Sequence, residues 1–62
     1  MNQEDKDAIA KAFVEGIEAL EMRQPCRAPY SNRAAKGTVE WFKGMAWTSG
    51  WNAEFIRRQP GR

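Results

Sequence analysis

The chain has 62 residues, a net charge of +2, one cysteine and no histidine. A chain of this length forms one small domain, which buries only about 60 % of the surface that its unfolded form exposes. Disulfides, metal ions, association or efficient helix packing commonly stabilise such domains. Cys26 alone cannot form an intrachain disulfide, and a Cys/His zinc site is excluded. We therefore expect no metal and no cofactor, and we expect stability to come from packing or from a partner.

The first residues are acidic and polar, whereas a secretory signal peptide begins with basic residues and continues with an apolar run. No apolar stretch approaches the roughly 20 residues of a membrane-spanning helix. The single thiol fits a reducing compartment. These features predict a cytoplasmic protein with no membrane partner.

Charge is unevenly distributed along the chain. Residues 1–22 hold six acidic and two basic side chains, a net charge of −4, and residues 23–62 hold eight basic and two acidic ones, a net charge of +6. A basic half of this kind indicates a surface for a polyanion such as a nucleic acid. Soluble proteins also carry comparable patches without such a partner, so charge leaves both interpretations open.

Residues 4–22 are predicted to form an amphipathic helix. Asn2 is a candidate N-cap for it. Gly16 lies in its middle, where glycine costs about 1 kcal/mol relative to alanine, so we expect another backbone to come close there. The stripe expected to be buried has helical spacing and consists of Ile9, Phe13, Ile17 and Leu20, widened by Ala10 and Val14.

The first helix is expected to end at residue 22, ahead of Pro25, because the residue before a proline is disfavoured in helical conformation. Residues 23–37 then form a linker, which also contains Pro29. Helix connections usually have two to eight residues, so this one should contain its own turn, pack against the helices or contact a partner. Residues 31–36, with Ser31 as cap, are the candidate turn.

Residues 38–58 are predicted to form the second helix, with Thr38 as N-cap and with Pro60 and Gly61 ending it. Arg57 and Arg58 lie favourably at its negative end. All three tryptophans fall in this helix, and its aromatic residues extend too far around it for one partner helix to cover. The expected core face consists of Val39, Phe42, Ala46, Ser49, Gly50 and Ala53.

These elements predict one all-α domain over residues 1–62, in which two antiparallel helices are joined by a long proline-containing linker. We expect the helices to cross where Gly16 meets Gly50. Two helices have a thin core, so some tryptophan surface should remain for the linker or for a second copy in a homodimer.

The order of several short motifs resembles the ribosome modulation factor family, over roughly residues 8 to 55. The matching residues are Ala12, Gly16, Ala19, Cys26, Pro29, Tyr30, Gly37-Thr38-Val39-Glu40 and Ala46-Trp47-Thr48-Ser49-Gly50-Trp51. The resemblance implies a small helix–linker–helix protein that binds the small ribosomal subunit near the 3′ end of 16S ribosomal RNA. It also implies repression of translation through inactive ribosome dimers, which is ribosome hibernation.

This chain departs from the family pattern in its acidic first helix, since the founding type is strongly basic, and in a longer segment from Tyr30 to Gly37. Both departures suit a divergent member, and relatives of this kind occur on phages and mobile elements.

For RNA, we expect basic side chains to contact phosphates while Tyr30 or an exposed tryptophan stacks on an unpaired base. Alternatively, Tyr30 packs the linker onto the helices and the basic side chains are solvated. The competing function is a protein-binding module that inhibits a host protein complex through its aromatic face. The candidate RNA- or partner-binding residues are Arg27, Tyr30, Arg33, Lys36, Lys43, Trp47, Trp51, Arg57 and Arg58.

Catalysis is not expected, and no catalytic residue is predicted. The sequence contains no G-x-x-x-x-G-K-[ST] phosphate-binding run. Its solitary cysteine has no histidine to act as a base, and two helices offer little concavity for an active site.

Overall fold

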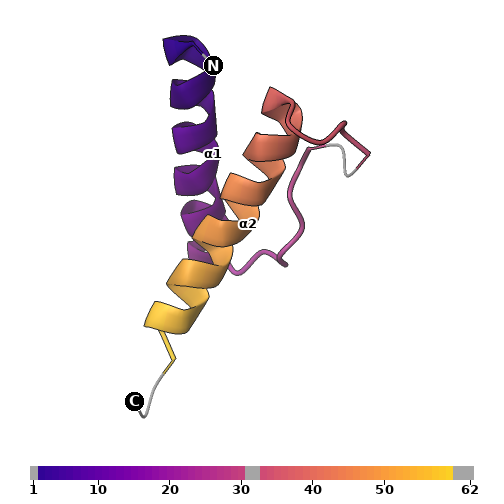
Figure 1. The fold of residues 1–62 in the computed structure, drawn as a ribbon. Helices are drawn as coiled ribbons and strands as arrows, with labels where there is room; N and C mark the ends of the chain where they lie inside the picture. The colour runs from indigo at the N-terminus through magenta and orange to yellow at the C-terminus, as the bar shows by residue number, and fades with distance from the viewer. Residues whose placement is uncertain (1, 31–32, 60–62) are drawn as a thin grey trace.

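The fold, as given by a computed structural model that describes residues 2–30 and 33–59, consists of two helices. Helix α1 extends over Gln3–Glu21 and helix α2 over Val39–Arg57. No strand occurs among the described residues, so the chain belongs to the predicted all-α class. The segment that connects the helices contains Pro25 and Pro29 and lies along one side of the pair (Figure 1).

The two helices run in the same general direction, so the predicted antiparallel arrangement is wrong. Both begin at the top of Figure 1 and end toward its bottom. The C-terminal ends of the helices are also in contact, since Nη2 of Arg58 lies 3.4 Å from Oε2 of Glu21. In an antiparallel pair these residues would lie at opposite ends. The connection is long enough to return the chain to the start of α1, which a short loop cannot do.

Both predicted N-caps are confirmed. The side chain of Asn2 accepts a hydrogen bond from the backbone N–H of Asp5 at 2.8 Å, and Thr38 accepts one from Trp41 at 3.3 Å. The Thr38 hydroxyl also donates to the carbonyl of Ala35 at 2.7 Å, which joins the end of the linker to the first turn of α2. Each helix thus begins where a short polar side chain satisfies a free backbone donor.

Helix α1 ends several residues before Pro25, through a Schellman motif. The N–H of Gln24 donates to the carbonyl of Ala19 at 2.9 Å, and that of Arg23 donates to Leu20 at 2.8 Å. Arg23 takes a φ of 60°, the left-handed conformation that glycine usually supplies at this position. The helix was predicted to end at residue 22, and it ends at Glu21, with Met22 as its C-cap. The other predicted end signals, Pro60 and Gly61, and the turn cap Ser31 lie outside the described residues.

The helices cross at two glycines, as predicted. A Cβ atom on Gly16 would collide with the carbonyl oxygen of Trp47 and lie 2.9 Å from its carbonyl carbon. A Cβ atom on Gly50 would collide with the carbonyl oxygen of Phe13 and lie 3.0 Å from its carbonyl carbon. At each glycine the neighbour is backbone, so only a residue without a side chain allows this approach.

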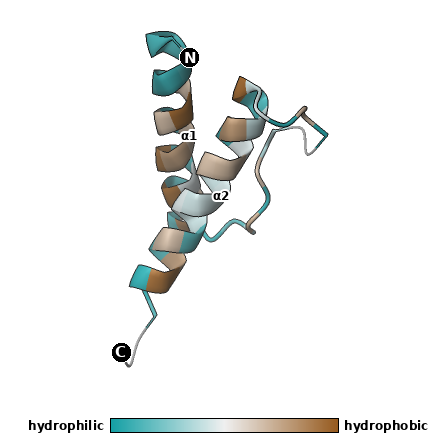
Figure 2. Ribbon diagram, in the orientation of Figure 1, coloured by the Kyte–Doolittle hydropathy of each residue, from teal (hydrophilic) through white to brown (hydrophobic). Residues whose placement is uncertain are grey.

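The buried face of each helix differs from the predicted one because the backbones approach so closely. Helix α1 buries Ala12, Gly16 and Ala19, whereas Phe13 and Val14 of the predicted stripe are 38 % and 49 % exposed. Small residues occupy the contact, and the larger apolar ones flank it. Figure 2 shows that the middle of α1 is more hydrophobic than its first turns. The remaining large stripe residues, Ile9, Ile17 and Leu20, are half-buried.

Helix α2 turns Trp47, Gly50 and Glu54 inward instead of most of the predicted core face. Of that predicted face, Val39, Phe42 and Ala46 are half-buried, and Ser49 and Ala53 are exposed. The resulting core is small and consists of Ala12, Ala19 and Trp47, with Ala28, Tyr30, Ala46 and Trp51 packed against it. The linker therefore supplies part of the core through Ala28 and Tyr30.

Candidate functional site

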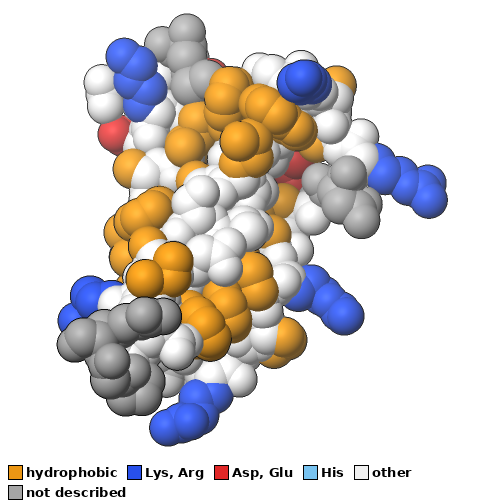
Figure 3. Space-filling view, turned by 60° about the horizontal axis from the view of Figure 1, so that its bottom comes forward, with side chains coloured by type: hydrophobic (Ala, Val, Ile, Leu, Met, Phe, Trp, Pro, Cys, Tyr) orange, Lys and Arg blue, Asp and Glu red, His pale blue; other side chains and the backbone are white. Residues whose placement is uncertain are grey.

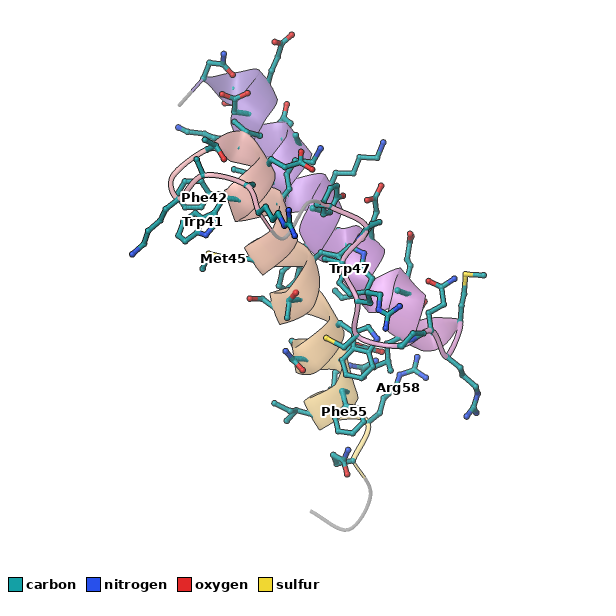
Figure 4. The ribbon with its side chains drawn as sticks, turned by 90° about the vertical axis from the view of Figure 1, so that its right-hand side faces the viewer. Trp41, Phe42, Met45, Trp47, Phe55 and Arg58 are labelled. Carbon is teal, nitrogen blue, oxygen red and sulfur yellow. The ribbon has the colours of Figure 1, made fainter. Side chains whose placement is uncertain are left out.

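An open groove lies between the linker and α2. It has a volume of about 780 Å³ and is lined by Arg27, Ala28, Tyr30, Trp41, Gly44, Met45, Thr48 and Ser49. Gly44 leaves the floor open, since a Cβ atom there would meet nothing within 4 Å. Figure 4 shows Trp41 and Met45 on the side of α2 that points away from α1. The groove thus combines an apolar floor, three side chains with hydroxyls and one guanidinium.

Tyr30 fixes the linker to both helices. Its hydroxyl donates a hydrogen bond to Oε1 of Glu15 in α1 at 3.0 Å, and Nζ of Lys43 in α2 lies 4.8 Å from the centre of its ring. Burial and the Glu15 carboxylate together raise the pKa of the Tyr30 hydroxyl. These contacts favour the packing role considered for Tyr30 over base stacking, because a lysine covers one face of its ring.

Trp41 is the aromatic residue of the groove that the sequence analysis did not select. It is half-buried and makes an edge contact with Phe42, with ring centroids 4.9 Å apart. A signal for it was present: Trp41, Met45 and Thr48 have the i, i+4, i+7 spacing of one helix face. That face carries no acidic side chain, so it was a candidate surface for an anionic partner.

Two of the predicted contact residues hold the fold together. Trp47 is only 4 % exposed and lies between the helices, so its indole cannot stack on a base while the fold is intact. Trp51 is half-buried, and its indole N–H donates to the carbonyl of Gln24 at 2.9 Å. The Trp51 ring also stacks on Phe55, with centroids 5.3 Å apart. Trp47 is thus corrected from a contact residue to a core residue, and Trp51 holds the linker.

Glu54 organises the C-terminal end, and the sequence analysis did not identify it. Its carboxylate is 6 % exposed, and it accepts hydrogen bonds from Arg57 at 2.7 and 3.0 Å and from Arg58 at 2.7 Å. The hydrogen bonds from Arg57 and then Arg58 lower the pKa of Glu54 to about 2. The two arginines follow Glu54 by three and four residues, which is the helical spacing of an ion pair.

The predicted basic residues therefore fall into separate groups. Arg27 lines the groove, Lys43 lies over Tyr30 beside it, and Arg33 and Lys36 are exposed in the linker. Arg57 and Arg58 lie at the far end of α2, where Glu54 offsets their charge; Figure 4 shows Arg58 beside Phe55 at that end. In the view of Figure 3, lysine and arginine side chains project around a surface on which hydrophobic side chains gather.

Neither described helix is long and apolar enough to cross a membrane. Within residues 2–30 and 33–59, no three His, Cys, Asp or Glu side chains form a group able to hold a metal ion.

Comparisons with protein-family models, with curated proteins and with solved structures find no match to this chain.

Proposed function

We propose that the chain is a non-catalytic cytoplasmic binding protein whose groove takes a single-stranded segment of RNA. The observation that carries this proposal is the placement of Trp41 and Arg27 in one open groove, from two different segments of the chain. RNA is read chiefly at single-stranded loops and ends, where unstacked bases lie on aromatic rings while basic side chains hold the phosphates.

Each part of the groove has a role in this proposal. The Trp41 indole, backed by Phe42, offers a surface on which a base stacks. Arg27 contacts a phosphate, and the hydroxyls of Thr48 and Ser49 form hydrogen bonds with base edges or ribose. The Tyr30 contacts to α1 and Lys43 fix the linker wall of the groove, which limits the ordering cost of binding.

The proposed target is the ribosomal RNA of the small subunit, with repression of translation as the consequence. The motif order that resembles ribosome modulation factor supports this choice. Tyr30 of the Pro29-Tyr30 motif lines the groove, and the Ala46–Trp51 motif contributes Thr48 and Ser49 to the groove and Trp47 to the core. The positive charge of the chain lies in its linker and second helix, which are the two segments that form the groove.

The alternative function is docking on a host protein complex. Several large apolar side chains are exposed, including Met45 at 50 % and Phe55 at 45 %, and such residues are common in protein interfaces. The two functions differ in their response to salt. Phosphate contacts release counterions and weaken steeply as salt rises, whereas apolar docking is much less sensitive.

Co-sedimentation with purified bacterial small ribosomal subunits, at low and high salt, tests the proposal. We expect binding at low salt that is lost at high salt. Replacing Trp41 with alanine should weaken binding about tenfold, since stacking on one base contributes about 1–3 kcal/mol. Replacing Arg27 with alanine should reduce the salt dependence of the affinity by about one phosphate contact.

The matched control is Lys11→Ala, which removes one positive charge from the exposed surface of α1, outside the groove. This variant should bind as the unmodified chain does. A chain that stays in the supernatant at low salt contradicts the ribosomal target. Binding that persists at high salt and survives Trp41→Ala supports docking on protein instead.

A further inference from the structure

We infer that the face of the helix pair opposite the linker binds a second copy of this chain in an antiparallel, two-fold homodimer. This face, named the apolar face below, comprises Ile9, Phe13, Ile17 and Leu20 of α1 and Ala46 and Ala53 of α2. None of the six residues lines the RNA groove, and the inference does not depend on the proposed function.

Helix geometry places the apolar face. In α1, Glu15 holds the linker through Tyr30, and Phe13 lies about 160° around the helix from Glu15 at 3.6 residues per turn. In α2, Trp51 holds the linker through Gln24, and Ala53 lies about 160° around the helix from Trp51. Phe13 and Ala53 therefore both lie on the side of their helix that the linker does not cover.

The apolar face lacks charge at its centre and remains open. Phe13 is 38 % exposed, Ala53 is exposed, and Ile9, Ile17, Leu20 and Ala46 are only half-buried. None of these six residues is polar, but the exposed Ser49 lies between Ala46 and Ala53 on the same side of α2. A contiguous apolar surface with polar residues at its border is typical of an interface in a soluble protein.

No large side chain of the described residues is fully buried, so a second copy on the apolar face would add to a thin core.

Charge complementarity selects a second copy in antiparallel orientation. Lys6 precedes Phe13 by seven residues on the same side of α1, and Glu21, which also lies 3.4 Å from Arg58 of its own chain, follows Leu20 at the other end. A two-fold axis near Phe13 brings Lys6 of one copy opposite Glu21 of the other, twice.

The test is the mass of the full chain in solution, measured by light scattering and sedimentation from about 1 to about 500 µM, a range that detects micromolar affinity. We expect a reversible species of twice 7.1 kDa. Phe13→Glu should raise the dissociation constant at least about tenfold. Ala53→Glu should do the same, and because Ala53 is exposed, this variant keeps the test decisive if Phe13→Glu does not fold.

Met22→Glu is the matched control. It also replaces an apolar side chain, 71 % exposed, with a carboxylate, but it lies in the linker-side hollow next to Glu18 and Pro29. It should dimerise as the unmodified chain does. Lys6→Glu should weaken the dimer, and combining it with Glu21→Lys should restore affinity. A monomer throughout the concentration range overturns the inference, as does an Ala53→Glu variant that dimerises normally.

Discussion

The glycine crossing gives the sharpest test of the fold, because α2 contains two glycines in opposite environments. A Cβ atom on Gly50 collides with the backbone of Phe13 in α1, whereas a Cβ atom on Gly44 meets nothing within 4 Å. Both positions lie inside the same helix, so an alanine at either one gains about 1 kcal/mol of helix propensity. Only the Gly50 variant must also move the helices apart.

The expected magnitudes follow from this difference. Overpacking typically costs about 1–3 kcal/mol, and the upper end applies at Gly50 because the obstacle is backbone and cannot rotate away. After the propensity gain, Gly50→Ala should lower the free energy of unfolding by about 2 kcal/mol. Gly44→Ala should raise it by about 0.5–1 kcal/mol.

Thermal unfolding followed by circular dichroism measures both variants. For a domain of this size, about 2 kcal/mol corresponds to a fall in Tm of roughly 8–16 °C for Gly50→Ala. Gly44→Ala should raise the Tm by about 4 °C. All samples need one protein concentration, because association would also shift the Tm. If Gly50→Ala raised the Tm as Gly44→Ala does, the close backbone contact between the helices would be refuted.

Three further predictions concern the ends of the helices. Arg23→Gly should stabilise the chain by roughly 0.5–1 kcal/mol in chemical denaturation, because Arg23 has a φ of 60° and glycine adopts that conformation without steric cost. Unchanged stability would argue against the Schellman motif at the end of α1. The pKa of Glu54 is lowered from 4.5 to about 2, so its stabilising effect is complete above pH 4.5 and is lost as the pH falls toward 2. Glu54→Gln should therefore flatten the pH dependence of the Tm in that window, and a slope equal to that of the unmodified chain would contradict the assignment. Trp51→Phe should cost about 0.5–1.5 kcal/mol, because it removes the hydrogen bond from the indole to the Gln24 carbonyl. Amide exchange of residues 22–30 should accelerate, and protection equal to that of the unmodified chain would show that Trp51 does not hold the linker.

Local signals in the sequence predicted the local structure well. Asn2 and Thr38 are short polar residues directly before a helical pattern, and both cap a helix in the structure. The mid-helix Gly16 and Gly50 predicted a close crossing, and each packs against the backbone of the other helix. These predictions succeed because caps and close contacts depend on one or two residues and their immediate geometry.

The buried faces could not be predicted from hydrophobicity. Ile9, Phe13, Ile17 and Leu20 have the strongest apolar periodicity in α1, yet the buried residues are Ala12, Gly16 and Ala19. Periodicity identifies an apolar side of a helix, but it does not distinguish a side that packs within the chain from a side that packs against another molecule. In a two-helix chain both kinds of surface are large, so the stripe with the bulkiest residues can be the outer one.

The candidate site was predicted in part. Arg27 and Tyr30 border the groove and Lys43 lies beside it, as expected for residues selected by charge and aromatic character. Trp41 replaces Trp47 as the available indole, because the inward side of α2 is centred on Trp47 and Gly50. Only the partner helix decides which tryptophan is covered, and that information is not local in the sequence. The ion pairs of Glu54 could have been predicted locally, because two arginines follow it at helical spacing.

The direction of the helices shows how linker length should be weighed. Helix α1 has 19 residues and is about 28 Å long. A second helix antiparallel to it needs only a short loop. A second helix parallel to it needs a connection that covers the whole length of α1. Residues 22–38 can span up to about 56 Å when extended, which is enough to return and to pack on the way. The connection has many more residues than a short loop needs, and this length was therefore a signal for parallel helices. That direction has a consequence for function: the returning linker supplies Arg27 and Tyr30 as one wall of the groove, which an antiparallel pair with a short loop would lack.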